Sequence, residues 1–135
     1  MQIAIAVAVG ILLATSPAYA QDGSPAGQTD AGAVVFKKCM ACHQVGPSAR
    51  NGVGPVLNGV VGRSAGTYPD YNYSPATRNS GLVWDEQTLA RYLRAPREVV
   101  PGTRMLFIGL KKDQEVADVI AYLKRFDAGG ERASR

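Results

Sequence analysis

The stretch 37–46, KKCMACHQVG, decides how the rest of the sequence is interpreted. It contains both cysteines of the protein, Cys39 and Cys42, and its only histidine, His43. Side chains that bind metals or act as nucleophiles are therefore concentrated at one point of the chain. We infer that a functional site lies there, and that its chemistry has to be identified from the surrounding sequence.

Four kinds of site use such a cluster: a disulfide, a zinc site, a redox-active dithiol and a haem attachment site. A Cys39–Cys42 disulfide would close a very short loop and stabilise the fold little. Tetrahedral zinc needs four ligands or an open water position, and this sequence offers three soft ligands. A thioredoxin-like dithiol needs a βαβ context, which the sequence lacks. Cys-x-x-Cys-His is the c-type haem attachment signature, and export from the cytoplasm would favour it.

Met105 is the candidate for a second iron ligand. His43 is the only histidine, so two histidine ligands from one chain are excluded. Met40 lies inside the attachment motif and cannot reach the opposite face of a porphyrin. A lone methionine often fills a gap in a core, but Pro101 and Gly102 just before Met105 favour a stiff ligand loop. A thioether ligand favours reduced iron and suits an electron carrier.

The chain of 135 residues is predicted to contain one domain behind a leader. Residues 1–20 are apolar and end in Ala-Tyr-Ala, which predicts a signal peptide cleaved after Ala20 and hence a periplasmic protein, with a retained membrane anchor as the alternative. A flexible segment is expected at 21–30, the domain at 31–127 and a flexible tail at 128–135.

Basic residues outnumber acidic ones, with 15 Lys and Arg against 11 Asp and Glu. The net charge of +4 is compatible with acidic protein partners or with anionic membrane surfaces. On charge alone, a nucleic-acid binder and a merely solvated basic surface also remain possible.

The apolar periodicity predicts an all-α domain with long loops. Helix starts are expected where a capping residue precedes an apolar pattern, at Asp30, Ser74, Asp85 and Asp113. The segments 44–67 and 96–109 show no period and are predicted to be irregular loops. The last helix is expected to continue to Phe126.

Taken together, the motifs resemble those of the class I cytochromes c. The similarity rests on GAVVFKKCMACH, NGVGPVLNGVVGR, GLVWDEQTLARYLRAP, PGTRMLFIGLKK and ADVIAYL, which cover nearly the whole chain after the leader. The resemblance implies a fold of about four to five short helices and long loops wrapped around one haem c. In that fold Gly32 and Phe36 would meet Tyr122 where the terminal helices cross.

The resemblance also implies roles for the site residues. Cys39 and Cys42 would hold the haem as thioethers, and His43 and Met105 would ligate the iron. The carbonyl of Pro55 would accept a hydrogen bond from His43.

Five further polar roles follow from the same resemblance. Arg63, Tyr73 and Trp84 would donate to a buried haem propionate, Tyr92 would donate to the methionine sulfur, and Thr103 would lie near the inner propionate.

The implied function is that of a soluble, monomeric periplasmic one-electron carrier that does not bind nucleic acid and turns over no substrate. Expected partners are membrane redox complexes: a cytochrome bc complex, a terminal oxidase, a photosynthetic reaction centre or denitrification enzymes. Docking would use basic residues at the haem edge, namely Lys37, Lys38, Arg94, Arg104, Lys111 and Lys112. The alternatives are a haem peroxidase or ligand sensor with a labile Met105, and a haem-free interaction protein.

Overall fold

The computed structural model describes residues 27–132, so the predicted leader, residues 21–26 and residues 133–135 lie outside the described part. Its helices are α1 (Thr29–Phe36), α2 (Pro75–Arg78), α3 (Glu86–Arg94), α4 (Pro96–Val99) and α5 (Asp113–Leu123). Between 27 and 132 only isolated β-bridges occur, so the all-α prediction is confirmed. No helix in this range is both long and apolar enough to cross a bilayer.

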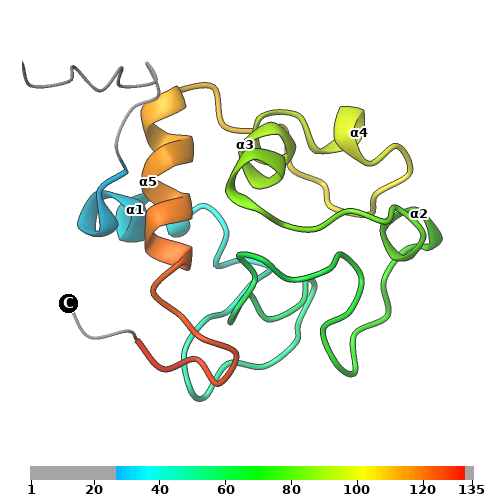
Figure 1. Cartoon of the computed structure of the whole chain (residues 1–135), viewed down its shortest axis with the longest axis horizontal. Coiled ribbons are helices and arrows are strands. Elements are labelled where there is room, and N and C mark those ends of the chain that lie inside the picture. The colour runs from blue at the N-terminus through cyan, green and yellow to red at the C-terminus, as the bar shows by residue number, and fades with distance from the viewer. Residues whose placement is uncertain (1–26, 133–135) are drawn as a thin grey trace, which may run out of the picture.

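The first and last helices cross, as the resemblance implies (Figure 1). Gly32 of α1 lies so close to α5 that a β-carbon on it would overlap the Asp118 carbonyl and lie 2.7 Å from Tyr122 Cβ. The rings of Phe36 and Tyr122 follow, with their centroids 5.4 Å apart. Glycine at this position therefore sets how closely the two helices approach.

The predicted cap of α1 is wrong. Asp30 lies in the first turn, and Gln28, at the N-cap position, makes no side-chain cap. Instead the Gln28 backbone N–H donates to the Asp118 carboxylate of α5 at 2.7 Å. Asp118 is 5% exposed and also accepts a hydrogen bond from Gln114. The acceptor for the backbone N–H at the start of α1 therefore comes from α5 and not from Asp30.

Two of the predicted caps are confirmed. Ser74 Oγ accepts the Thr77 N–H at 3.1 Å, and Asp85 Oδ1 accepts the Thr88 N–H at 2.7 Å. The hydrogen bonds from Thr88 hold the pKa of the Asp85 carboxyl below its ordinary value. Both residues satisfy a backbone donor at a helix start, which is the reason such residues are favoured there.

The predicted start and end of the last helix both need correction. Asp113 is the first residue of α5 rather than its cap, and its carboxylate binds Arg94 of α3. The helix ends at Leu123, earlier than the predicted Phe126, and the chain then turns. The Asp113 carboxylate thus contacts the neighbouring helix α3 and does not cap its own.

Two segments expected to be irregular contain local structure. Within 96–109, Pro96–Val99 forms α4 with proline at its first position, where no backbone donor is needed. The predicted tail is described up to Arg132 and begins with a turn in which the Gly130 N–H donates to Asp127 O at 3.0 Å; its flexibility stays a prediction. Gly130 packs on Gly46 with φ +82°, a conformation that favours glycine.

The loop 44–67 is irregular as predicted, but it is tied to the rest of the fold. The buried amide of Asn58 bonds both backbone groups of Gly46, at 2.8 and 2.9 Å. The Gly59 N–H donates to Phe126 O at 3.0 Å, which joins the loop to the end of the chain. This loop follows the Cys-x-x-Cys-His motif directly and forms one wall of the site.

Candidate functional site

The two cysteines and His43 lie in a turn that continues from α1. The Cys39 N–H donates to Phe36 O at 2.8 Å, and the His43 N–H donates to Cys39 O at 2.9 Å. Cys39 is half-buried, Cys42 is exposed, and the two are not joined by a disulfide. Burial raises the pKa of the Cys39 thiol, which Lys38 offsets only in part, so this sulfur lacks the thiolate character of a redox-active dithiol.

His43 is held by the loop on its far side. Its Nδ1 lies 2.7 Å from the Pro55 carbonyl oxygen, which can only accept, so Nδ1 carries the proton. Burial lowers the pKa of the imidazole, against the opposing effect of the Pro55 hydrogen bond. The ring is thus neutral near pH 7, with its Nε2 lone pair directed away from Pro55 and able to bind a metal.

Gly54 fixes the position of the His43 ring, a role that sequence reasoning missed. A β-carbon at Gly54 would overlap ring atom Cε1 and lie 2.7 Å from Nδ1 and 2.9 Å from Nε2. The imidazole therefore rests against bare backbone. The Gly-Pro dipeptide at 54–55 was the available signal, since a glycine beside a ligand-orienting residue often permits close approach.

Arg63 has a donor left over. Its Nη1 donates to Asn58 O at 2.8 Å and its Nη2 to Val56 O at 3.3 Å, and its guanidinium lies 4.9 Å from the centre of the Tyr68 ring. Its Nε is buried without a hydrogen-bond partner in the described structure. Burial lowers the pKa of this guanidinium, while Tyr73 and Tyr68 oppose that shift. An orphaned buried donor on a cation suits an anionic oxygen.

Tyr73 and Trp84 border the same region as buried rings. The Tyr73 hydroxyl accepts the Tyr68 N–H at 3.2 Å, and its ring packs edge-on against Tyr71 with centroids 4.8 Å apart. The centroids of the Trp84 and Tyr92 rings are 4.7 Å apart. Trp84 is buried in the apolar core, and its role as a propionate donor stays a prediction.

The Tyr92 hydroxyl lies beside the methionine segment. It is 3.1 Å from Thr103 Oγ1, and that oxygen also accepts the Met105 N–H at 3.2 Å. Thr103 therefore links Tyr92 to the backbone of Met105. The hydrogen bond from Tyr92 to the methionine sulfur stays a prediction.

The structure brings the two ends of the predicted site to one core. Residues of the site that are packed in or against a single apolar cluster are Cys39, Trp84, Tyr92 and Met105. Leu57 belongs to the same packing, from the loop that carries Pro55. Since these residues come from separate segments, the fold brings scattered motifs into one apolar cluster.

The residues present fit a haem better than they fit a bare metal ion. No group of three or more His, Cys, Asp or Glu in the described part of the chain could hold a metal. Two unpaired thiols beside a neutral imidazole, an apolar cluster and an orphaned Arg63 donor match a ring with apolar faces, an iron at its centre and anionic groups at one edge. The donor set therefore suits a porphyrin with carboxylate side chains.

Comparisons with known proteins agree with this description. The family model described as Cytochrome c matches residues 29–127. The chain is 54% identical over 121 residues to cytochrome c2 of Rhodomicrobium vannielii, covering 90% of this chain and 93% of that protein. It is 47% identical over 100 residues to cytochrome c-550 of Bradyrhizobium diazoefficiens, covering 74% of each. The solved structure of cytochrome c2 from Rhodospirillum centenum superposes with a TM-score of 0.72 at 42% identity, covering 75% of this chain and 99% of that one.

Proposed function

Because this chain belongs to the cytochrome c family, we propose that it is a soluble one-electron carrier with haem c attached through Cys39 and Cys42. In this proposal His43 and Met105 are the axial iron ligands. When bound, the haem supplies an iron that alternates between the ferric and ferrous states. The residues of the chain bind the haem and orient its ligands.

The observation that carries the proposal is the hydrogen bond between His43 Nδ1 and Pro55 O. It assigns the tautomer, orients the ring and leaves Nε2 as a ligand, as hydrogen-bonded partners of metal-binding histidines do. Gly54 limits where the ring can lie. The His43 ring fits only because residue 54 is a glycine with no side chain. A histidine that served only to fill the core would not need this close contact with the backbone.

Arg63 supports the proposal from the other side of the site. We assign its orphaned Nε to an inner propionate, with Tyr73 as a further donor in reach of the same region. An unpaired carboxylate in a dry pocket is costly, and a buried guanidinium with a spare donor removes that cost. Thr103 in turn holds the Met105 backbone and the Tyr92 hydroxyl together, which positions the methionine loop.

The ligand assignment is tested by replacing Met105 with alanine. The variant is expected to keep covalent haem but to lose the methionine-to-iron charge-transfer band at the red end of the ferric spectrum. It should also gain affinity for small ligands such as imidazole and acquire peroxidase activity that the parent lacks. A parent protein that already binds imidazole as readily as Met105→Ala would support the enzyme or sensor alternative instead.

We further propose that the protein docks on acidic surfaces of membrane redox complexes in the periplasm. Leu106 and Ile108, beside Met105, are 85% and 83% exposed and lie next to Lys111 in a surface groove. Exposed apolar side chains of this size beside cations suit a transient protein interface. Lys38 and Arg94 are ion-paired with Glu115 and Asp113, so we expect the other four predicted cations to contribute more to steering: Lys37, Arg104, Lys111 and Lys112.

Docking is tested by comparing Lys111→Gln with Lys124→Gln. Both remove one positive charge, but Lys111 directly precedes the N-cap of α5 and Lys124 is its C-cap, and the two caps are about 18 Å apart at 1.5 Å per residue. One charge about 10 Å from a partner charge in water contributes about 0.4 kcal/mol, or roughly twofold in rate. Lys111→Gln should slow electron transfer to an isolated cytochrome bc complex about twofold at low salt, and the difference should vanish near 0.15 M, where the Debye length is about 8 Å. Equal slowing by Lys124→Gln would refute this docking face.

A further inference from the structure

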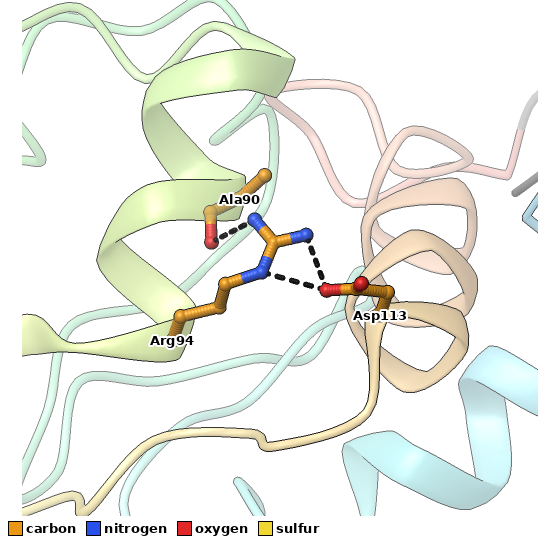
Figure 2. A network of polar contacts seen from close by, with 3 residues as sticks. All are labelled: Ala90, Arg94 and Asp113. Atoms are coloured by element: carbon orange, nitrogen blue, oxygen red, sulfur yellow. Dashed lines mark hydrogen bonds and ion pairs between the residues drawn. The ribbon is translucent and has the colours of Figure 1, made fainter. Parts of the chain in front are cut away.

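The segment that carries Met105 begins where α3 ends and finishes where α5 begins. Arg94 is the last residue of α3 and Asp113 is the first residue of α5, so their ion pair joins the two ends of that segment. Figure 2 shows the contact: Arg94 Nε and Nη2 both donate to Asp113 Oδ1, at 2.9 and 2.8 Å. We call this pair the loop clasp.

The guanidinium of the clasp is also bound by its own helix. Arg94 Nη1 donates to the Ala90 carbonyl oxygen one turn earlier, at 3.0 Å, which holds the guanidinium on the α3 surface (Figure 2). A cation in the last turn of a helix and an anion in the first turn are each favoured by the helix dipole. Both partners therefore occupy these positions at little cost when they meet.

Two backbone contacts lie beside the clasp. The Leu110 N–H donates to the Leu93 carbonyl oxygen at 2.8 Å. Gly109, with φ +99°, lies so close to the Arg94 carbonyl that a β-carbon would overlap it. The base of the methionine loop is thus fastened by one ion pair, one backbone hydrogen bond and one glycine contact.

We propose that Arg94 and Asp113 are positioning residues that keep Met105 on the iron by holding the base of its loop closed. The inference rests on the proposed ligation by Met105 and adds residues that touch neither the iron nor the haem ligands. Opening the base would allow residues 95–112 more conformations, and the methionine would leave its position more often. An exposed ion pair of good geometry stabilises by about 0.3–1 kcal/mol, so its loss should increase loop opening about two- to fivefold.

The structure offers a matched control. Lys124 and Glu86 join α5 and α3 at their other ends, with Nζ and Oε1 2.5 Å apart. The side chains of that pair are 49% and 57% exposed, against 43% and 69% for Arg94 and Asp113. The two ion pairs thus bind the same helices with similar exposure, but only the loop clasp joins the two residues that directly border the segment carrying Met105.

The test uses the ferric haem protein at pH 8, where imidazole is mostly uncharged, and measures how fast imidazole replaces the methionine. Arg94→Gln and Asp113→Asn should each accelerate replacement about two- to fivefold, and the double variant should do no more than either one. Lys124→Gln and Glu86→Gln should leave the rate unchanged. Equal acceleration by all four, or none by the clasp variants, would overturn the proposal.

A second measurement separates this proposal from the ligand assignment. Hydrogen exchange at the Leu110 and Thr103 amides, both donors inside the loop, reports opening without reference to the iron. Exchange should be faster in Arg94→Gln than in Lys124→Gln. If Met105→Ala leaves imidazole binding unchanged, the ligand assignment is wrong. If amide exchange is unchanged in Arg94→Gln, the clasp proposal is wrong even when the ligand assignment holds.

Discussion

Gly54→Ala tests most directly whether the His43 ring depends on close approach to the backbone. The added β-carbon would lie 2.7 Å from Nδ1 and 2.9 Å from Nε2 of the imidazole, so the ring or the loop has to move. Gly54 has no positive φ, and therefore alanine meets no backbone strain of its own. The expected effect comes from the collision alone.

The magnitude follows from two contributions. Forcing extra volume into a packed site costs about 1–3 kcal/mol. Moving the ring also breaks or lengthens the 2.7 Å hydrogen bond to Pro55, which contributes a net value of about 0.5–1.5 kcal/mol. We therefore expect Gly54→Ala to lower the free energy of unfolding by about 2–4 kcal/mol.

The assay is guanidinium unfolding followed by the fluorescence of Trp84, the only tryptophan. Gly52→Ala is the matched control from the same loop, because its β-carbon would lie 3.7 Å from Cys42 O, an ordinary contact. The ferric spectrum of Gly54→Ala should also change, since His43 is displaced. Equal stability of the two variants, with unchanged spectra, would refute the reasoning.

Three other variants test the fold around the site. Gly32→Ala should destabilise the protein by about 3 kcal/mol or more, because the added β-carbon would overlap the α5 backbone. Thermal unfolding followed by circular dichroism measures this effect, and an unchanged unfolding midpoint would mean that α1 can shift. Asp118→Ala should cost about 1–2 kcal/mol by the same assay, since the Gln28 N–H loses its acceptor, and a neutral result would show that water replaces it. Asp85→Asn should make the free energy of unfolding fall less steeply as the pH is lowered. The folded-state pKa of Asp85 lies below its unfolded value near 3.8, so its contribution to stability is complete above that pH. The contribution is lost as the pH falls through the folded-state pKa. Parallel acid limbs for parent and variant would contradict this.

The sequence predicted what depends on local chemistry. Ser74 and Asp85 cap the helices that follow them, because a side-chain oxygen near free backbone donors acts within a few residues. The motif at Cys39, Cys42 and His43 indicated its cofactor for the same reason, since the three groups act within one turn. The spacing of apolar residues likewise placed α3 and α5.

What the sequence did not predict depends on contacts between distant segments. Asp30 and Asp113 resemble caps, yet the Gln28 N–H at the start of α1 is accepted by Asp118, and the Asp113 carboxylate binds Arg94 of α3. The contact between the Tyr92 and Thr103 hydroxyls is of the same kind, because the two residues belong to different segments. The role of Gly54 also becomes visible only when the His43 ring is placed beside it.

The crossing of α1 and α5 has a consequence for the segment that leads into the cysteine motif. Among the described helices α1 packs only on α5, and a helix of eight residues is not stable alone in water. The helix that leads into Cys39 and Cys42 is therefore stable only once residues 113–123 pack against it. The last helix of the chain thus controls the order of the segment that leads into the cysteine motif.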